Sequence, residues 1–453
     1  MNRISSIPCF KAYDVRGVVP SELNPELAYK IGRAAAQYLS AKTFVIGRDI
    51  RASGEALSQA LAKGLTEGGA DVFDMGLCGT EMVYFAVAHQ QMDGGIMITA
   101  SHNPPEYNGM KIVRRESRPV GSETGLKEIE RLCLAGVFAA PERIGQVKTF
   151  DCTDAYIQRL LGGVDIGQLK PMKIVVNAGN GGAGIILDQL EKHLPFEFVK
   201  IHHLPDPSFP HGVPNPLLPE NRFNTSRAVK ESHAELGIAW DGDFDRCFFF
   251  DENGEFIEGY YIVGFLAQAL LAKRPGAKIV YDPRLVWNTI ELVEEAGGVP
   301  LPCKSGHAFI KEMMRREDAV YGGEMSAHHY FKDFFYCDSG MTPWLLMAEI
   351  LSQRGNPLSA LIAERIERYP VSGEINRRVK EPDSIFERVR RYYESMNPIV
   401  DEIDGLSIAF ETWRMNLRKS NTEPVIRLNV ESRGDIRLMR SKTEEVLDLI
   451  GAG

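Results

Sequence analysis

Thr43–Gly47, with the sequence TFVIG, begins a pattern that recurs along the chain and decides the predicted fold. This apolar run predicts a buried strand; a polar loop, an amphipathic helix from about Gly54 to Glu67 and a second strand at Ala70–Met75 follow it. Strand, polar loop and helix return in the same order from Lys173–Asn177 and from Lys278–Asp282. Recurrence of this unit at spacings of roughly 100–130 residues favours repeated βαβ domains.

The C-terminal part of the chain has a different pattern. From about Val371 it predicts two helices and three adjacent antiparallel strands, at Ser384–Glu394, Leu406–Phe410, Arg414–Arg418, Val425–Glu431 and Leu438–Ile450. We therefore predict an α/β protein with three similar domains of mixed βαβ sheets, at residues 1–145, 146–254 and 255–370. A smaller α+β domain is predicted at residues 371–453.

Composition and charge exclude several classes of protein. The 453 residues are 44% hydrophobic and 25% charged, as in ordinary globular proteins. The formal net charge of −9 disfavours a nucleic-acid-binding or anionic-membrane surface, so we expect neither partner. Seven scattered cysteines without a C-x-x-C pair favour a reducing compartment. Met1–Phe10 has no apolar signal segment and no apolar run approaches the ~20 residues that span a bilayer, so we expect a cytoplasmic protein. The sequence does not indicate an oligomeric state.

The stretch Asp241–Arg246 (DGDFDR) places three carboxylates between two apolar runs, Leu236–Trp240 and Cys247–Phe250, that predict buried strands. In a straight strand Asp241 and Asp245 would lie ~13 Å apart, at roughly 3.3 Å per residue. One cation could not bind both, so the segment must curl, and we expect the glycine at position 242 to permit the curl. A curled trio of carboxylates favours a Mg²⁺ site. The alternative is a solvated acidic turn.

A serine follows another predicted strand, Gly95–Ile98. Ser101 and His102 stand in the loop Thr99–Pro104, with Lys111 a few residues beyond, so Ser101 is a candidate nucleophile. The G-x-S-x-G motif of hydrolases is absent, and adjacency in sequence does not aim the His102 ring at the serine. The alternative is a capped turn without chemistry.

Two polar loops are candidates for binding an anionic substrate. The stretch 418–424 (RKSNTEP), with Arg427 after it, offers forked guanidinium groups and hydroxyl donors to a phosphate. Its alternative is a hairpin turn that satisfies its own backbone. In the stretch Gly323–His329, Glu324 could accept sugar hydroxyls with help from Ser326, whereas the two histidines also fit a surface pair.

A competing motif stands at Gly179–Gly184, which matches G-x-G-x-x-G after a strand and before a helix. This context suits dinucleotide binding, and Asp206 lies about 20 residues further on, as the fingerprint requires. Asp206 lies in a Pro-rich loop, however, and the glycines also suit a tight strand-to-helix turn without a ligand.

Four of these loops occur here in the order seen in the α-D-phosphohexomutases: Ser-His-Asn-Pro, Asp-Gly-Asp-x-Asp-Arg, Gly-Glu-Met-Ser and Arg-x-Ser-Asn-Thr-Glu-Pro. The opening stretch Lys11–Gly17 (KAYDVRG) also fits this family. The chain resembles the family along its whole length, with one motif in each predicted domain. Within the family, Met325 favours the bacterial phosphomannomutases. The resemblance implies four domains around a central cleft.

The resemblance also implies roles for individual residues. Ser101 matches the phosphoserine, and Lys111 matches a position near the transferring phosphoryl group. Arg246 is expected to supply a further positive charge beside the three carboxylates, and His102 is also a candidate catalytic residue. The implied Mg²⁺ ligands are Ser101, Asp241, Asp243 and Asp245. The implied substrate-binding residues, which line the cleft or bind sugar hydroxyls and the remote phosphate, are Arg16, Arg284, His307, Glu324, Ser326, His328, Arg418, Ser420, Asn421, Thr422 and Arg427.

The implied reaction interconverts mannose 6-phosphate and mannose 1-phosphate. Phosphorylated Ser101 would phosphorylate a hexose monophosphate, and the resulting hexose 1,6-bisphosphate, which also acts as activator, would turn over and return its other phosphate. Hexose phosphates are thus the implied partners, and GDP-mannose and surface polysaccharide synthesis are the implied destination. Three alternatives are dual mannose and glucose specificity, a phosphatase with Asp241 as nucleophile, and a non-catalytic sugar-phosphate-binding protein.

Overall fold

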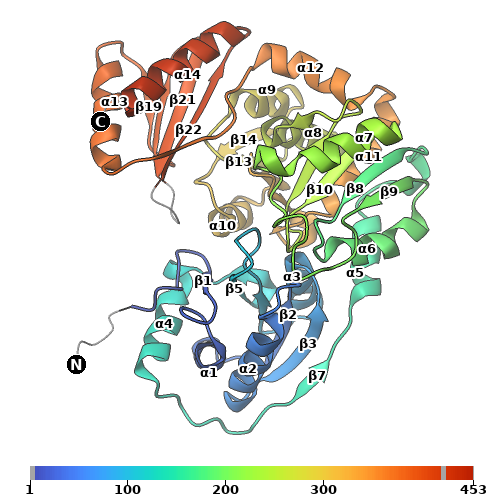
Figure 1. Cartoon of the computed structure of the whole chain (residues 1–453), viewed down its shortest axis with the longest axis vertical. Helices are drawn as coiled ribbons and strands as arrows, with labels where there is room; N and C mark the ends of the chain where they lie inside the picture. The colour runs from blue at the N-terminus through green and yellow to red at the C-terminus, as the bar shows by residue number, and fades with distance from the viewer. Residues whose placement is uncertain (1–5, 420–424, 452–453) are drawn as a thin grey trace. The chain divides into compact units, whose positions relative to one another are not determined.

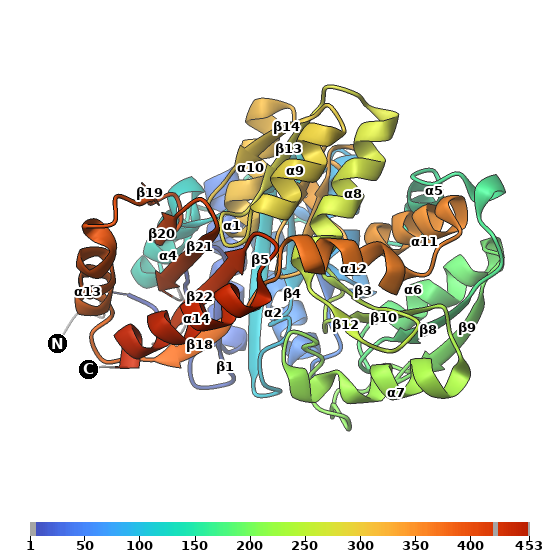
Figure 2. The same cartoon turned by 90° about the horizontal axis from the view of Figure 1, so that it is seen from above.

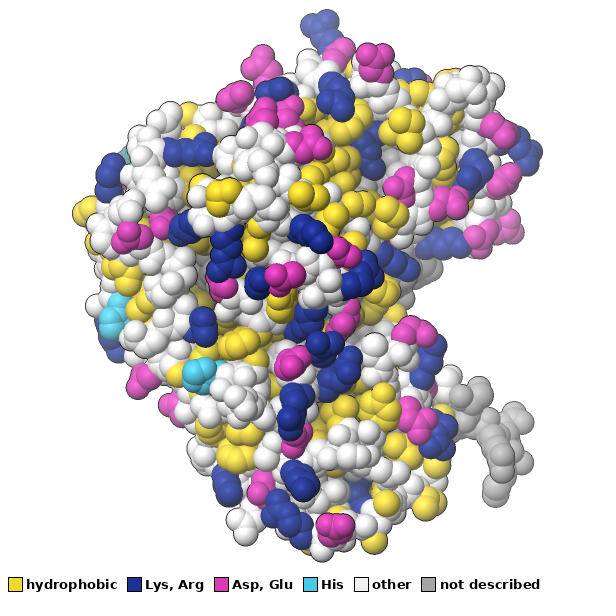
Figure 3. Space-filling model, turned by 180° about the vertical axis from the view of Figure 1, so that it is seen from behind, with side chains coloured by type: hydrophobic (Ala, Val, Ile, Leu, Met, Phe, Trp, Pro, Cys, Tyr) yellow, Lys and Arg dark blue, Asp and Glu magenta, His cyan; other side chains and the backbone are white. Residues whose placement is uncertain are grey.

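The computed structural model describes residues 6–419 and 425–451. The chain divides into two compact units: Met1–Phe256 with His328–Arg354 is unit 1, and Ile257–Ala327 with Gly355–Gly453 is unit 2. None of the helices that the structure describes is both long and apolar enough to cross a membrane. On the face displayed in Figure 3, basic and acidic side chains are interspersed among hydrophobic ones.

Unit 1 begins with a mixed sheet in the order β1-β5-β4-β2-β3-β7, with β6 paired to β5. Its strands are β1 (Val15–Val18), β2 (Thr43–Arg48), β3 (Asp71–Leu77), β4 (Gly94–Ile98), β5 (Tyr107–Arg114), β6 (Arg118–Pro119) and β7 (Val147–Thr149). Its helices are α1 (Pro25–Leu39), α2 (Gly54–Glu67), α3 (Thr80–His89) and α4 (Leu126–Ala135). The strand β2 is parallel to β3 and β4, whereas β5 is antiparallel to β4 and β1. The prediction of a mixed α/β sheet is confirmed.

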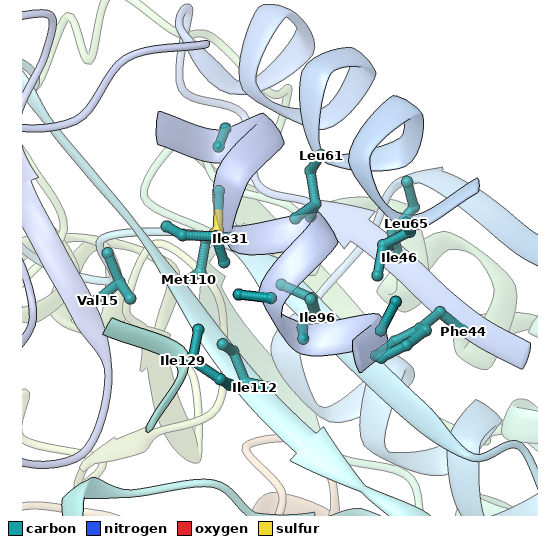
Figure 4. Close-up of a cluster of buried hydrophobic side chains, with 14 of the residues drawn as sticks. Val15, Ile31, Phe44, Ile46, Leu61, Leu65, Ile96, Met110, Ile112 and Ile129 are labelled. Carbon is teal, nitrogen blue, oxygen red and sulfur yellow. The ribbon is translucent and has the colours of Figure 1, made fainter. Parts of the chain in front are cut away.

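Alternation along β2 explains why helices cover both faces of this sheet. Phe44 and Ile46 belong to a core that α1, α2 and α4 complete with side chains such as Ile31, Leu61 and Ile129 (Figure 4). Residues one position further along point to the opposite face, because successive side chains of a strand alternate. There a Cβ at Gly47 would meet the side chain of Val83 in α3 at 2.9 Å.

The second sheet of unit 1 runs in the order β11-β10-β8-β9, with β10 parallel to β8 and antiparallel to β11. Figure 2 shows helix α7 along one side of these strands and α6 along the other. The elements are α5 (Thr153–Leu161), β8 (Lys173–Asn177), α6 (Ala183–Leu190), β9 (Glu197–Ile201), α7 (Phe223–Ser232), β10 (Leu236–Trp240), β11 (Cys247–Phe250) and β12 (Phe256–Ile257). The later segment of unit 1 adds β16 (His329–Phe331), β17 (Cys337–Asp338) and α11 (Thr342–Arg354). The predicted bounds of α2, β8, β10 and β11 are confirmed.

Unit 2 contains a third α/β arrangement, in which β13 is parallel to both β14 and β15. Figure 1 labels β13, β14 and the helices α8, α9 and α10. The elements are α8 (Gly259–Lys273), β13 (Lys278–Tyr281), α9 (Trp287–Glu295), β14 (Val299–Pro302), α10 (His307–Glu317), β15 (Tyr321–Gly323) and α12 (Leu358–Arg368).

Unit 2 ends with an antiparallel sheet in the order β18-β22-β21-β20-β19. The elements are β18 (Ile375–Arg378), α13 (Pro382–Glu394), β19 (Ile399–Asp401), β20 (Leu406–Ala409), β21 (Trp413–Lys419), β22 (Val425–Ser432) and α14 (Ile436–Gly451). Met415, Leu417 and Leu428 form its core with side chains of α13 and α14. The predicted α+β pattern is confirmed, whereas β18 and β19 were not predicted.

Helices α1 and α2 cross in close contact at two glycines. An ideal Cβ at Gly64 would lie 2.1 Å from the backbone oxygen of Tyr29, and one at Gly32 would lie 2.5 Å from the backbone oxygen of Leu61. Neither helix has room for a side chain at the crossing, because the atoms in the way belong to backbone.

We expect Gly64→Ala to lower the free energy of unfolding by about 1–3 kcal/mol, although alanine is the better helix former. Urea denaturation measures the change. Gly451→Ala is the control: Gly64 lies inside α2, whereas Gly451 is the last residue of α14 and a Cβ there would meet no atom within 4 Å. Equal stability of the Gly64→Ala variant and the wild type would contradict the close crossing.

Candidate active site

Ser101 lies at the carboxyl edge of the first sheet, where three strands bring distant residues together. Because β2 and β4 are parallel, the segments that follow Arg48 and Ile98 leave the sheet side by side. The antiparallel β5 places Lys111 opposite Met97 at the same edge. Ser101 itself is 4% exposed and has φ 50°, a left-handed conformation that non-glycine residues rarely adopt.

The serine loop is held by Arg51, which the sequence analysis did not identify. One guanidinium nitrogen donates to the carbonyl oxygens of Pro104 and Tyr107 at 2.7 and 2.9 Å. The other donates to those of Ser101 and Asn103 at 2.9 and 2.6 Å. Five donors in a rigid fork suit four carbonyl groups of one loop. The only sequence signal was an arginine shortly after a predicted strand.

The acidic loop after β10 does curl, but not through its glycine. Phe244 has the left-handed φ of 45°, whereas Gly242 does not have a positive φ. The prediction that Gly242 supplies the bend is therefore wrong. Gly242 is required for close approach instead, because a Cβ there would lie 2.7 Å from the backbone oxygen of Ser101.

Lys111 neutralises part of the buried acidic loop. Its Nζ donates to Oδ2 of Asp243 at 2.7 Å and to Asp245, and all three side chains are buried. Burial alone would lower the pKa of Lys111, but the two carboxylates raise it above its ordinary value. Burial favours the neutral form of Asp243, yet the charge of Lys111 outweighs it and lowers the pKa of that carboxyl. Burial, and then the charge of Asp243, raise the pKa of Asp245 to about 7.

The acidic loop also fits a divalent cation. Ligand oxygens of Asp241, Asp243 and Asp245 all lie within 4.8 Å of one another. Among residues 6–419 and 425–451, no donor reaches Oδ1 of Asp243 or Oδ1 of Asp245, although both atoms are buried. Buried carboxylate oxygens without donors are costly unless a positive charge compensates them. Three hard oxygen ligands are the set that Mg²⁺ or Ca²⁺ prefers.

Arg246 joins the acidic loop to the serine. Its Nη2 donates to Oδ2 of Asp241 at 2.7 Å, to Oγ of Ser101 at 3.2 Å and to Nδ1 of His102 at 2.5 Å. The Ser101 hydroxyl in turn donates to Oδ2 of Asp241 at 2.8 Å. Because arginine has only donors, Nδ1 of His102 must accept, so the ring is neutral with its proton on Nε2. Burial, and then the charge of Arg246, lower the pKa of His102 well below its ordinary value.

Two more predicted residues belong to this group in unit 1. Arg16 donates to the side chain of Asn103 at 2.7 Å, within the serine loop. The backbone of His328 forms an isolated antiparallel β-bridge with that of Arg246. The Nδ1 atom of His328 lies 3.3 Å from Asp338 and 3.9 Å from Asp245. The structure thus places Ser101, His102, Lys111, the three aspartates, Arg246, Arg16 and His328 in one neighbourhood.

A buried acid at the start of α3 supports the same loop. Glu81 accepts hydrogen bonds from the hydroxyls of Tyr156 and Ser339 and from the backbone N–H of Gly340. Its neighbour Thr80 donates to the Asp243 carboxylate. Burial raises the pKa of Glu81 to about 8. The sequence signal for Glu81 is a single acid in the first turn of an otherwise apolar helix, and the sequence analysis did not identify it.

Gly340 explains why this support reaches the acidic loop. A Cβ at Gly340 would lie 2.3 Å from the backbone oxygen of Phe244, and the Gly340 carbonyl accepts from Trp240 at 2.9 Å. The Gly-rich stretch packs there as well, since a Cβ at Gly181 would lie 2.8 Å from the oxygen of Gly242. Its glycines therefore have a packing function that requires no dinucleotide.

Unit 2 holds a second group of predicted substrate-binding residues. Arg284 pairs with Asp282 at 2.9 Å, and its Nη2 lies 3.3 Å from Oγ of Ser326 and 3.8 Å from Glu324. Glu324 accepts from the backbone N–H of Gly306 at 2.8 Å, next to His307, which begins α10.

Arg418 and Arg427 lie on the adjacent strands β21 and β22. Each contacts Glu374, at 3.1 and 3.2 Å. The remaining predicted residues, Ser420, Asn421 and Thr422, lie outside the described residues.

Comparison with known proteins identifies the family. Models of the phosphoglucomutase/phosphomannomutase alpha/beta/alpha domains I, II and III match residues 8–139, 154–254 and 258–369, and a model of the C-terminal domain matches residues 374–448. The chain belongs to the phosphoglucomutase/phosphomannomutase family.

Relatives match this family member over almost its whole length. A protein of Xanthomonas campestris pv. campestris named "Phosphohexose mutases" is 57% identical over 98% of this chain and 99% of its own. The phosphomannomutase of Salmonella montevideo is 55% identical over 99% of this chain and 100% of its own. The crystal structure of a phosphoglucomutase/phosphomannomutase family protein from Burkholderia thailandensis has a TM-score of 0.89 and 33% identity, and covers 99% of this chain and 98% of its own.

We expect Arg51→Lys to lower the free energy of unfolding by about 3 kcal/mol, because an ammonium cannot supply the planar fork and carbonyl groups of the serine loop lose their donors. Urea denaturation measures this loss. Arg115→Lys, at an exposed arginine, is the matched control and should change stability by less than about 0.5 kcal/mol. Equal stability of the two variants would show that Arg51 does not hold the serine loop.

Proposed function

We propose that this protein is a phosphomannomutase that interconverts mannose 6-phosphate and mannose 1-phosphate. Phosphomannomutases that match the chain from end to end, at 52–55% identity, support the activity. The observation that carries the chemistry is the buried contact of the Ser101 hydroxyl with Asp241 and Arg246. The Oγ atom of Ser101 thus has the Asp241 carboxylate as a hydrogen-bond acceptor and the positive charge of Arg246 beside it.

The proposed first step transfers a phosphoryl group from phosphorylated Ser101 to the free hydroxyl of a hexose monophosphate. The Oγ–P bond of the serine breaks and a bond from phosphorus to the sugar oxygen forms. The sugar hydroxyl loses its proton and the serine oxygen regains one, so hexose 1,6-bisphosphate and an unphosphorylated Ser101 result. After the intermediate turns over, the reverse transfer of its other phosphate regenerates phosphoserine and releases the isomeric monophosphate.

Charge stabilisation is the main task in such a transfer, because negative charge spreads over the phosphoryl oxygens. Arg246 donates to Ser101 directly, and Lys111 offers an ammonium at the adjacent carboxylates. Asp241, Asp243 and Asp245, with Ser101, are the proposed ligands of Mg²⁺. When bound, this ion would supply charge neutralisation to the phosphoryl oxygens. His102 accepts from Arg246, so it fixes that guanidinium rather than acting as a cation itself.

The residues of unit 2 would bind the part of the substrate that does not react. Glu324 is a proposed acceptor for sugar hydroxyls, in contact distance of Arg284, which also approaches Ser326. Arg418 and Arg427 are proposed to bind the phosphate that is not being transferred, together with Ser420, Asn421 and Thr422. His307, Arg16 and His328 are proposed to contact the substrate as well.

The direct test follows mannose 1-phosphate by phosphorus NMR with Mg²⁺ and a trace of glucose 1,6-bisphosphate, with glucose 1-phosphate in a parallel sample. Appearance of mannose 6-phosphate establishes the mutase, and the ratio of the two rates measures the preference between sugars. Release of inorganic phosphate would favour the phosphatase, and absence of any change with folded protein would overturn the proposal.

We expect Ser101→Ala to abolish turnover and covalent phosphate incorporation while the free energy of unfolding changes by less than about 1 kcal/mol. Mass spectrometry of protein incubated with glucose 1,6-bisphosphate locates the phosphate. Ser208→Ala, at an exposed serine that hydrogen-bonds Asp206, is the control and should retain both properties. A phosphorylated Asp241 in place of Ser101 would reject the serine mechanism.

We expect Mg²⁺ to stabilise the wild-type protein by about 2.7 kcal/mol at a concentration 100 times its dissociation constant. Asp243→Asn should lose most of this gain, because it removes one of three buried carboxylates. Thermal unfolding with Mg²⁺ and with EDTA measures the difference, and Asp448→Asn, at an exposed position, serves as the control. An equal Mg²⁺ response in the wild type and Asp243→Asn would remove Asp243 from the ligand set.

A further inference from the structure

Two arginines face each other on the C-terminal sheet. Arg418 of β21 and Arg427 of β22 are direct partners in the antiparallel register. Like charges directly opposite each other in a sheet repel and destabilise it. Leu417 and Leu428 point into the core beneath α13 and α14, so alternation places the two arginines on the other face. This pair requires a counter-anion.

Glu374 supplies that negative charge. Its Oε2 lies 3.1 Å from Nη2 of Arg418 and 3.3 Å from Nη1 of Arg284, and its Oε1 lies 3.2 Å from Nη1 of Arg427. Three guanidinium groups thus converge on one carboxylate that is 20% exposed. Burial would favour the neutral acid, but the charges of Arg284, Arg427 and Arg418 outweigh it and lower the pKa of Glu374 to about 2.

The backbone fixes Glu374 in this place. The preceding residue, Gly373, has φ 68°, and its carbonyl oxygen accepts from the side chain of Asn429 at 3.0 Å. Ser372 exchanges two hydrogen bonds with Val430 of β22, both at 2.9 Å. The carboxylate therefore belongs to a chain segment that is attached to the same strand as Arg427.

We propose that Glu374 is an internal counter-ion of the arginine pair Arg418 and Arg427, the phosphate clamp. Glu374 occupies the guanidinium donors of these arginines until a substrate phosphate competes for them. The inference rests on the proposed function, in which these arginines bind the non-reacting phosphate. Glu374 then sets how tightly that phosphate is bound, and does not itself take part in the transfer.

Charges indicate the direction of the effect. Asp282 neutralises Arg284 through a two-point contact, at 2.9 Å for both pairs of atoms. Glu374 places one negative charge against the two positive charges of Arg418 and Arg427. A phosphate dianion must displace or approach this carboxylate, so Glu374 weakens phosphate binding. Weaker binding of the phosphate suits a bisphosphate that must leave the clamp and rebind through its other phosphate. Binding that is equally tight in the ground state and the transition state does not accelerate turnover.

The test replaces the charge but keeps the shape and the acceptor oxygen, with Glu374→Gln. Isothermal titration with inorganic phosphate and with mannose 1-phosphate should show roughly fivefold tighter binding than in the wild type. The gain should shrink as salt rises. KM for mannose 1-phosphate should fall, and kcat should fall with it because the bound species leave more slowly. The ligand-free variant should also unfold at a lower temperature, since the arginine pair loses its counter-ion.

Asp383→Asn is the matched control. Asp383, with a side chain that is 88% exposed, pairs with Lys419. Lys419 follows Arg418 in β21, so its side chain lies on the opposite side of the strand. This variant should leave both dissociation constants and the kinetic constants unchanged. Tighter phosphate binding by both variants would attribute the effect to overall charge and overturn the inference.

Unchanged or weaker phosphate binding by Glu374→Gln would show that Glu374 only positions the arginines, and would also overturn the inference. Failure of the proposed function has a different signature. In that case Arg418→Ala would not weaken mannose 1-phosphate binding, and the wild type would not produce mannose 6-phosphate. An active wild type that Arg418→Ala weakens, without tighter binding by Glu374→Gln, would reject the counter-ion alone.

Discussion

The contact between Lys111 and the carboxylates of Asp243 and Asp245 is the constraint on which the rest of unit 1 depends. Three buried aspartates in five residues would repel each other without positive charge close by. Arg246 supplies it from the acidic loop itself and Lys111 supplies it from the first sheet, so the first sheet must end where the acidic loop lies. In the first sheet β2 is parallel to β4, and in the second sheet β8 is parallel to β10. The loops that follow these strands therefore leave each sheet at its carboxyl edge.

Much of the fold follows from local patterns. The bounds of α2, β8 and β10 were predictable because apolar residues recur with one clear period between glycines and polar loops. Short strands such as β18 and β19 were not, since they have three or four residues each and their side chains are mostly exposed. The proposed domain limits remain a prediction, because contacts divide the chain into units that combine separate segments.

The candidate site was predictable only where chemistry is concentrated in one stretch of sequence. The acidic loop and the serine loop each present several functional groups within six residues, and the structure brings them together. Arg51 and Glu81 act through partners 50 and 75 positions away, and Glu374 acts through partners 44, 53 and 90 positions away. No local pattern encodes such pairs. The source of the bend in the acidic loop was missed for a related reason, since a phenylalanine with left-handed backbone is fixed by its packing and not by its own preference.

The charge pair at Lys111 has a consequence for the order in which the chain is made. Lys111 is complete 132 and 134 positions before the two aspartates that it contacts. At a synthesis rate of about 5–20 residues per second, the interval between synthesis of Lys111 and synthesis of the two aspartates is on the order of ten seconds. During that interval a lysine destined for a buried position keeps its hydration. We therefore expect this edge of the first sheet to remain hydrated until Asp243 and Asp245 are made, and that water to leave when the two carboxylates bind Lys111.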